Sequence, residues 1–213
     1  MSAGHGTAGF QPGYDALADL YAETFPSPFT NILQRHAFDA FVEHVRGSGV
    51  TGTVVDVGCG PGLLTAELAA RGFDVIGVDP STSMLRIARS THPAVGFVSD
   101  DARLGAPELA GVTVAAILAR FSLIHVPPDA VPDVLAGWAE RMDAGSIVLV
   151  AGQASADEGI VDFDHRVAPA WRWHPDRMSA ALADAGYDEE WRTVHRADDD
   201  HRFPEFHVLA RRR

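Results

Sequence analysis

Residues 53–62 read Thr-Val-Val-Asp-Val-Gly-Cys-Gly-Pro-Gly, and this stretch decides the fold. The mostly β-branched residues 53–57 are typical of a buried parallel strand. The strand ends at Gly58, Gly60 and Gly62, which let the backbone take up positive φ and approach a ligand closely. Residues 63–70, Leu-Leu-Thr-Ala-Glu-Leu-Ala-Ala, then have helix composition. The glycines therefore lie on a strand-to-helix turn, which is where open α/β sheets bind nucleotides.

The charges around this turn narrow the choice of ligand. Asp56 lies two residues before the first glycine, and residues 51–70 contain no Lys or Arg. A carboxylate beside the loop would repel a pyrophosphate or triphosphate, whereas it suits a ligand with cationic groups and no phosphate. S-adenosylmethionine (SAM), with its ammonium and sulfonium groups, is such a ligand.

Composition limits the classes of partner. The chain has 213 residues, 46% of them hydrophobic, which is enough for one sizeable core. Its net charge of −12 argues against a nucleic-acid or anionic-membrane partner, because both need a basic footprint. No apolar run approaches the ~18 residues of a membrane span, and residues 1–11 lack the layout of a secretory signal. We expect a soluble cytoplasmic monomer or homodimer that acts on a small molecule.

No metal site is predicted. The single cysteine, Cys59, gives neither a disulfide nor a zinc pattern. The run Asp198-Asp199-Asp200 is interpreted as a solvated hairpin turn.

Strand and helix patterns alternate along most of the chain, which predicts a parallel sheet covered on both faces. Two amphipathic helices, 14–24 and 32–45, precede this alternation and should cap the sheet. Ser81 and Asp129 are expected to be helix N-caps. The alternation is predicted as strand 53–57, helix 62–70, strand 74–78, helix 81–90, strand 95–98, strand 112–118, helix 129–142 and strand 145–151.

The C-terminal third departs from this rhythm. Residues 152–172 are loop-like and rich in Asp, His and Trp. A helix should begin at Pro175 and end before Gly186. Two last strands, about 189–195 and 203–209, should form an antiparallel hairpin.

Four stretches resemble one known family. Residues 54–62 resemble the first motif of the Rossmann-like (class I) SAM-dependent methyltransferases. Residues 72–81, Gly-Phe-Asp-Val-Ile-Gly-Val-Asp-Pro-Ser, resemble that family's second strand, which ends in an acidic residue. Residues 97–102 resemble its third strand and acidic turn, and residues 119–125 fall where its fourth strand runs into the next helix. The resemblance spans roughly residues 12–210.

The resemblance implies a fold and a division of the chain. The fold is a doubly wound, mostly parallel, seven-stranded α/β sheet with a C-terminal antiparallel hairpin and an N-terminal helical cap. We expect one domain over residues 1–213. Residues 1–48 would form the cap or lid and 49–213 the core, with 152–172 as a lid-like insertion.

The resemblance also assigns cofactor contacts. Asp79 would accept hydrogen bonds from both ribose hydroxyls of the adenosine, with a helix cap or solvated turn as the alternative. Asp100 or Asp101 would face the adenine edge. Met84 and Leu85 either pack on the adenine or belong to the core. The full predicted cofactor set is Tyr14, Tyr21, Asp56, Gly58, Cys59, Gly60, Pro61, Gly62, Asp79, Pro80, Ser81, Met84, Asp100, Asp101, Ala102, Ala119, Arg120 and Phe121.

The acceptor side is predicted from fewer signals. Tyr14 and Tyr21 share one helix face, and in the resembling family a Tyr from this helix reaches the methionine end of SAM. His125, after the fourth strand, is the candidate general base, and His165 is the second candidate; a structural role is the alternative for each. Residues 152–172 and the first helix would form a lid, with Phe163, Trp171 and Trp173 as an apolar wall.

Three functions are compared. The leading one is methyl transfer from SAM to a hydroxyl or amine of a small acceptor, such as a natural-product intermediate. An NAD(P)-dependent oxidoreductase is disfavoured because residues 58–62 are one residue short of G-x-G-x-x-G, and because a lysine-free chain has no Tyr-x-x-x-Lys pair. A non-catalytic SAM-binding regulator or partner subunit fits the same loop.

Overall fold

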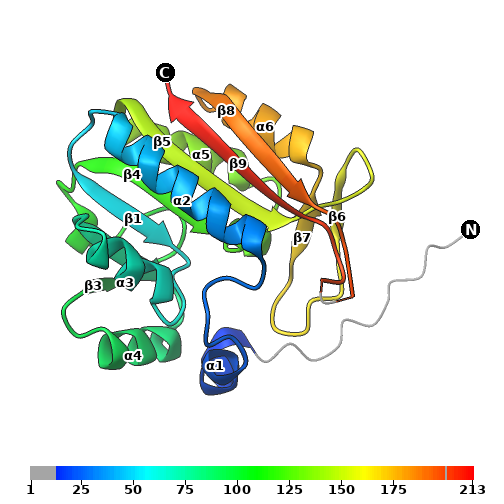
Figure 1. Cartoon of the computed structure of the whole chain (residues 1–213), viewed down its shortest axis with the longest axis horizontal. Helices are drawn as coiled ribbons and strands as arrows, with labels where there is room; N and C mark the ends of the chain where they lie inside the picture. The colour runs from blue at the N-terminus through cyan, green and yellow to red at the C-terminus, as the bar shows by residue number, and fades with distance from the viewer. Residues whose placement is uncertain (1–12, 200) are drawn as a thin grey trace, which may run out of the picture.

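The computed structural model describes residues 13–199 and 201–213 (Figure 1). Predictions that fall on residues 1–12 or on Asp200, among them the lack of a leader and the first part of the cap, lie outside the described residues. A seven-stranded sheet in the order β3-β2-β1-β4-β5-β9-β8 forms the centre. Its strands are β1 (Thr53–Val57), β2 (Val75–Asp79), β3 (Gly96–Ser99), β4 (Val114–Arg120), β5 (Met142–Gln153), β8 (Tyr187–His195) and β9 (Glu205–Arg212).

The sheet is mostly parallel, as predicted. Strands β1 to β5 pair in parallel. Strand β9 runs against both β5 and β8, so β8 points the same way as β1 to β5. The predicted C-terminal antiparallel hairpin is therefore present, as β8 and β9.

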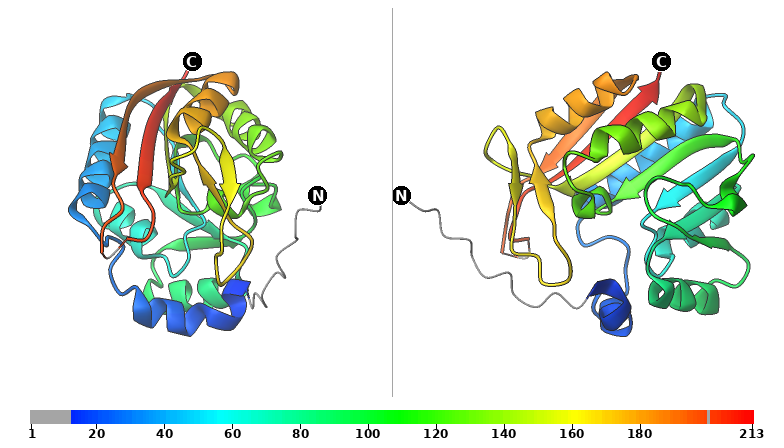
Figure 2. Two further views of the ribbon diagram at one scale, coloured as in Figure 1. Left: turned by 90° about the vertical axis from the view of Figure 1, so that its right-hand side faces the viewer. Right: turned by 180° about the vertical axis from the view of Figure 1, so that it is seen from behind.

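Helices cover both faces of the sheet (Figures 1 and 2). Neighbouring residues of β1 point to opposite faces: Val54 packs with α2 and α3, whereas Val55 packs in the cluster that includes α5 and α6. All five residues of β1 are buried, because helices cover the side chains on both faces of the sheet. The helices are α1 (Gly13–Thr24), α2 (Ile32–Gly47), α3 (Leu63–Ala70), α4 (Thr82–Thr91), α5 (Val131–Glu140) and α6 (Pro175–Asp184), with single 3-10 turns at Pro107–Leu109 and Leu123–His125.

The strand order reverses between β1 and β4, because β2 and β3 lie on one side of β1 and β5 on the other side of β4. In open α/β sheets, ligands bind in the crevice outside the carboxyl ends of the strands at such a reversal. In Figures 1 and 2, α1 lies across from this edge of the sheet, beside the loop that joins β6 to β7. The topology therefore places the site between the strand ends and α1.

Three local predictions are corrected by the structure. Helix α5 begins at Val131 rather than 129, its N-cap is Ala130, and Asp129 makes no capping bond, since Pro132 sets the first turn. Strand β5 begins early, at Met142. Residues 152–172 are not all loop, because β6 (Ile160–Asp162) pairs antiparallel with β7 (Trp171–Trp173). Ser81 does cap α4 as predicted, accepting a hydrogen bond from the Met84 N–H at 3.1 Å.

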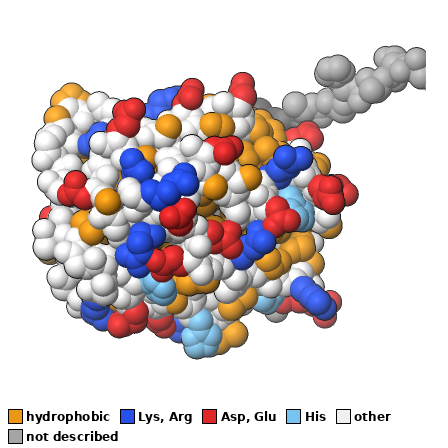
Figure 3. Space-filling view, turned by 90° about the horizontal axis from the view of Figure 1, so that it is seen from above, with side chains coloured by type: hydrophobic (Ala, Val, Ile, Leu, Met, Phe, Trp, Pro, Cys, Tyr) orange, Lys and Arg blue, Asp and Glu red, His pale blue; other side chains and the backbone are white. Residues whose placement is uncertain are grey.

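The outer edge near the C-terminus carries both signs of charge. Seen from above in Figure 3, Arg and acidic side chains are intermingled on this face. Arg192 of β8 pairs with Asp176, and Arg211 of β9 pairs with Glu190. Strand β8 is the edge strand here, and charged side chains on an edge strand resist pairing with other chains. Within the described residues, no helix is both long and apolar enough to cross a membrane.

Candidate functional site

A cavity of about 920 Å³ lies at the carboxyl edge of the sheet, where β1 and β4 diverge. This volume is at the upper end of the range of about 300–1,000 Å³ for ligand pockets. Of the residues predicted for the site, those that line the cavity are Tyr14, Tyr21, Asp56, Gly58, Cys59, Gly60, Pro61, Asp79, Pro80, Ser81, Met84, Arg120, Phe121, His125 and His165. Gly62, Asp100, Asp101, Ala102 and Ala119 are not among the lining residues.

The glycine loop is fixed by backbone contacts to β2. The N–H groups of Gly58 and Cys59 both donate to the Val78 carbonyl, at 2.7 and 3.0 Å. A Cβ on Gly58 would lie 2.2 Å from the Ser122 side chain, so this glycine allows close packing within the protein. Gly60 has φ 53°, and a Cβ there would meet no protein atom within 4 Å. The space beside Gly60 therefore belongs to the cavity.

Asp79 joins the end of β2 to this loop. Its carboxylate, which is 8% exposed, accepts hydrogen bonds from the N–H groups of Gly60 and Ser81, both at 2.8 Å. Burial raises the pKa of Asp79, and the two backbone hydrogen bonds partly offset that shift. A buried carboxylate is thus held beside the loop, with lone pairs left to accept further donors.

Asp56 lies beneath the loop and is 3% exposed. The Thr65 hydroxyl donates to its carboxylate at 2.7 Å. Burial raises the pKa of Asp56 to about 6 despite that hydrogen bond. The Arg120 guanidinium of β4 also opposes the rise in the pKa of Asp56, whereas the glycine loop itself contains no cationic side chain.

The predicted residues outside the cavity lining have other contacts. The Asp100 carboxylate accepts from the Ala106 N–H at 2.6 Å, and Asp101 pairs with Arg103. The Ala102 carbonyl accepts from the Trp138 indole N–H. Gly62 lies against the Phe97 ring, and Ala119 is fully buried in the core.

Tyr14, His125 and His165 gather at one side of the cavity. The Pro169 carbonyl can only accept, so the His125 Nδ1 that lies 2.8 Å from it carries the proton. In the neutral ring Nε2 is then an acceptor, and the Tyr14 hydroxyl donates to it at 2.9 Å. Burial lowers the pKa of His125 to about 4. The His165 ring lies 4.8 Å from that of His125, between centroids.

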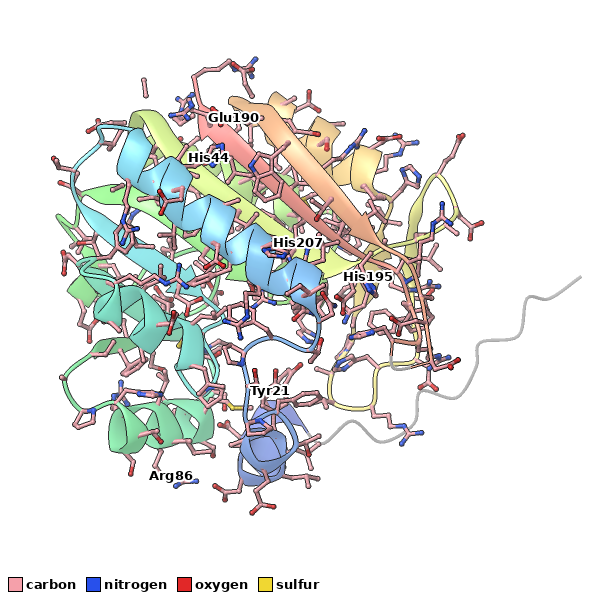
Figure 4. All side chains as sticks on the ribbon, in the orientation of Figure 1. Tyr21, His44, Arg86, Glu190, His195 and His207 are labelled. Carbon is pink, nitrogen blue, oxygen red and sulfur yellow. The ribbon has the colours of Figure 1, made fainter. Side chains whose placement is uncertain are left out.

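Helix α1, predicted to be part of a lid, is hydrogen-bonded to both sides of the site. The Asp15 carboxylate of α1 accepts from the Ser81 hydroxyl at 2.7 Å and from the Ser83 N–H at 2.9 Å. The Gly13 N–H donates to the Val167 carbonyl at 2.9 Å. Figure 4 places Tyr21 on the side of α1 nearest the sheet. Phe163 lines the cavity, but Trp171 and Trp173 do not and pack with the core instead.

Sequence reasoning missed a polar wall at the far end of the cavity. Gln34 of α2 and Glu205 of β9 are both buried and joined by a 2.8 Å hydrogen bond. The Arg120 guanidinium donates to Gln34 and to the Pro28 carbonyl, at 3.1 Å each. Gln153 completes the wall. A polar residue at the end of a strand's apolar run, as in Gln153, is the signal that would have indicated it.

The wall holds polar atoms without a protein partner. Among the described residues, buried atoms that lack one include the Arg120 Nε, the Ser122 Oγ and the Gln153 Oε1. Buried polar groups are normally hydrogen-bonded, and each exception calls for an explanation such as a ligand or water. These three atoms all belong to residues that line the cavity.

Known proteins resemble this chain in sequence and in fold. Residues 54–145 match the family described as methyltransferase domain. A trans-aconitate 2-methyltransferase of Azoarcus sp. (strain BH72) is 51% identical over 137 residues, which are 62% of this chain and 49% of that protein. The chain spans about half or less of the length of the relatives that it matches.

Solved structures agree in fold. The magnesium protoporphyrin IX methyltransferase from Synechocystis PCC 6803 with bound SAM has a TM-score of 0.69 and 17% identity, over 94% of this chain and 93% of that one. Residues 54–145 thus match the methyltransferase-domain family, and the chain as a whole has the fold of class I methyltransferases. A second relative in fold is the 1,6-didemethyltoxoflavin-N1-methyltransferase of Burkholderia thailandensis, with a TM-score of 0.66 and 18% identity, over 100% of this chain and 93% of that one.

The family match covers only part of the candidate site. Residues 54–145 include the glycine loop, Asp79 and Arg120 to His125. They leave out α1, Gln34, residues 152–172 and Glu205. The part of the cavity within the family match is thus the glycine loop, Asp79 and the residues that follow β4.

Proposed function

We propose that this methyltransferase binds SAM at the glycine loop and methylates a hydroxyl or amine of a small molecule at the polar wall. The observation that carries the proposal is the pairing of an open, positive-φ Gly60 with two buried carboxylates, Asp56 and Asp79, at one end of a single cavity. Cationic groups without phosphate match those carboxylates. Trans-aconitate, the acceptor named for the Azoarcus relative, is also a small molecule.

Different residues around the glycine loop bind different parts of SAM. In this proposal Asp79 accepts hydrogen bonds from the ribose hydroxyls, and the negative charge of Asp56 favours the cationic end of SAM. Met84 lines the same part of the cavity and offers an apolar contact. Bound SAM supplies an electrophilic methyl group on a sulfonium centre.

The remaining residues position the acceptor and exclude water. Helix α1 and residues 163–168 close the cavity from the outside, as a lid. Positioning and desolvation provide most of the acceleration in a displacement of this kind. Arg120, Ser122 and Gln153 offer both donors and acceptors to a polar acceptor molecule.

His125 is the group proposed to take up the acceptor's proton. Its Nε2 lone pair faces the cavity side but is occupied by the Tyr14 hydroxyl. The proton can therefore reach Nε2 directly, once Tyr14 turns away, or pass through the Tyr14 oxygen. Because burial lowers the pKa of His125 to about 4, the ring stays neutral and able to accept a proton down to about that pH.

Binding is tested by calorimetry with SAM, S-adenosylhomocysteine, NAD and NADP on the whole chain. We expect the first two to bind and the last two not to bind. Micromolar NAD affinity without SAM binding would falsify the assignment of the loop. Turnover is tested by S-adenosylhomocysteine formation with phenols, amines and small carboxylic acids, trans-aconitate included. SAM binding without turnover on any acceptor would favour the regulator or partner subunit.

The base is tested by a pair of variants. His125→Asn should lower turnover by ~10²–10⁴-fold with SAM affinity nearly unchanged, because Asn replaces a hydrogen bond but takes no proton. Tyr14→Phe separates the two routes. It should match the loss of His125→Asn if the proton passes through Tyr14, and should keep most activity if the acceptor reaches Nε2 directly. Near-wild-type turnover in His125→Asn would show that His125 is not a general base and that the acceleration comes from positioning.

The pH profile adds an independent check. With a pKa of about 4 for His125, turnover should stay level from neutral pH down to about 5, rather than fall below about pH 6.5 as it would with an ordinary histidine. A fall centred near pH 6.5 would point away from His125 as the base.

Cys59, a buried free thiol whose pKa burial raises well above its ordinary value, takes no part in this chemistry. A single unreactive thiol suits the reducing cytoplasm, where we place the enzyme.

A further inference from the structure

Three metal-ligating side chains converge where β8 joins β9. His195 ends β8, and Asp198 and His201 lie in the connection that follows. One ligand atom from each lies within 4.8 Å of the other two. Figure 4 marks His195 at the lower end of β8, where the connection to β9 begins. The residues recur every third position, as His-x-x-Asp-x-x-His.

The contacts in this cluster are centred on the carboxylate. The His201 Nδ1 lies 2.7 Å from the Asp198 Oδ1, and the His195 Nε2 lies 3.5 Å from the Oδ2. The His195 Nδ1 is buried and has no partner among the described residues. The rings of the two histidines lie 5.2 Å apart, between centroids. The two imidazoles thus approach the same carboxylate, His201 at Oδ1 and His195 at Oδ2.

We propose that His195, Asp198 and His201 bind a divalent transition-metal ion of the zinc type. Two imidazoles and one carboxylate are a ligand set that suits Zn²⁺ and its neighbours, with water in a fourth position. Bond lengths of about 2.0–2.2 Å place tetrahedral ligand atoms roughly 3.4 Å apart. The atoms here, all within 4.8 Å of one another, therefore need only small side-chain adjustments to reach that spacing.

Metal binding would replace a hydrogen bond that the structure contains. The Nδ1 of His201 donates its proton to Asp198 when no metal is bound, and that proton must leave as the ion enters. The sequence prediction of no metal site considered the acidic run 198–200 alone. It overlooked the two histidines that lie three residues to either side of Asp198.

The position of the cluster gives the ion a structural role in the proposed function. The His201 Nε2 lies 3.1 Å from the Thr30 hydroxyl, which ties the connection to the segment before α2. Thr30, Arg202 and Phe203 all line the acceptor end of the cavity. The Arg172 guanidinium lies 4.1 Å from the centre of the Phe203 ring. An ion at this cluster would brace one wall of that cavity without touching the reacting groups.

The test is a titration of the metal-free full chain with Zn²⁺ by calorimetry, and with Co²⁺ by visible absorption, which reports tetrahedral coordination. We expect one tight equivalent. His195→Ala and His201→Ala should each weaken it at least tenfold. His201→Gln and Asp198→Asn, which keep a polar side chain in place, should weaken it in the same way and guard against loss of folding.

His174→Asn is the matched control. His174 also lies beside an aspartate, with its Nδ1 3.6 Å from Asp176, but among the described residues no third ligand converges on this pair. Asparagine preserves its N-cap role at α6. This variant should bind Zn²⁺ like the wild type.

Two results would overturn the proposal. One is a wild-type chain without a tight equivalent of Zn²⁺. The other is equal binding by the wild type and a folded His195→Ala/His201→Ala double variant, as judged by circular dichroism. Both readouts are independent of SAM binding and turnover, so failure here is distinguishable from failure of the proposed function.

Discussion

The two ends of the cavity are built differently. At the cofactor end, the binding groups come from short stretches around residues 56–61 and 79–84, and backbone N–H groups hold the Asp79 carboxylate in place. At the acceptor end, the wall is assembled from α2, β4, β5 and β9, and three of its buried polar atoms lack protein partners among the described residues. One end is preorganised by local structure, whereas the other is assembled from distant segments and keeps buried polar atoms without a protein partner in the described part of the chain. This is the division expected of an enzyme with a shared cofactor and its own acceptor.

The largest effect should come from Gly60→Val at the cofactor end. A branched side chain there resists the positive φ and enters the space of the ligand. SAM affinity, measured by calorimetry, should fall at least about a hundredfold, roughly 2.8 kcal/mol. Gly72→Val is the control, because Gly72 also has positive φ and open space but lies outside the cavity lining. Equal SAM affinities in Gly60→Val and Gly72→Val would show that Gly60 does not border the bound ligand.

Asp79→Ala should weaken SAM binding by about 1.5–3 kcal/mol, since charge-assisted hydrogen bonds to the ribose are lost. The glycine loop also loses the acceptor of the Gly60 N–H. Asp100→Ala removes a carboxylate outside the cavity lining and should leave affinity unchanged. A comparable loss in Asp100→Ala would support the adenine contact predicted from the sequence.

His207→Leu tests the acid sensitivity of β9, the strand that brings Glu205 to the acceptor end. His207 is fully buried on β9, and burial together with Arg120 lowers its pKa to about 3. The unfolded chain takes up this proton below about pH 6.5, so the folded state loses stability as the pH falls from there toward 3. At pH 5, His207 should lower the free energy of unfolding by about 2 kcal/mol relative to pH 7.

Denaturant unfolding at pH 7 and pH 5 measures this loss. The difference between the two pH values should shrink in His207→Leu and should persist in His36→Leu, where the histidine is exposed. An unchanged difference in His207→Leu would mean that the buried imidazole is not the acid-sensitive group.

The smallest expected effect is the release of a fraction of a proton when SAM binds at the cofactor end. With its pKa raised to about 6, Asp56 is about half protonated at pH 6, and a cationic ligand nearby should expel about that fraction of a proton. SAM binding heats at pH 6 should then differ between buffers of different ionisation enthalpy. Asp56→Asn should abolish the difference. Identical heats for the wild type would show that the cationic end of SAM lies away from Asp56.

The sequence predicted more of the cofactor end of the cavity than of the acceptor end. The glycine loop, Asp79 and the Ser81 cap are local patterns, so the sequence located the strand ends and the cofactor end of the cavity. Gln34 and Glu205 meet only after β9 inserts between β5 and β8, an arrangement that no local pattern encodes. Strands β6 and β7 have three residues each, too few for a visible alternation. The adenine contact predicted for Asp100 or Asp101 stays a prediction, and the sequence did not indicate that the Asp101 carboxylate pairs with Arg103.

The attachment of α1 has a consequence for the order of events in a catalytic cycle. Toward the cofactor side, Asp15 binds the first turn of α4 through a side chain and a backbone N–H. Toward the acceptor side, α1 is held by one backbone bond to Val167 and by the Tyr14 contact to His125. The helix should therefore swing away from the acceptor side first, hinged on α4. Such a hinge favours an ordered sequence, in which the methylated product leaves before S-adenosylhomocysteine and SAM enters before the acceptor.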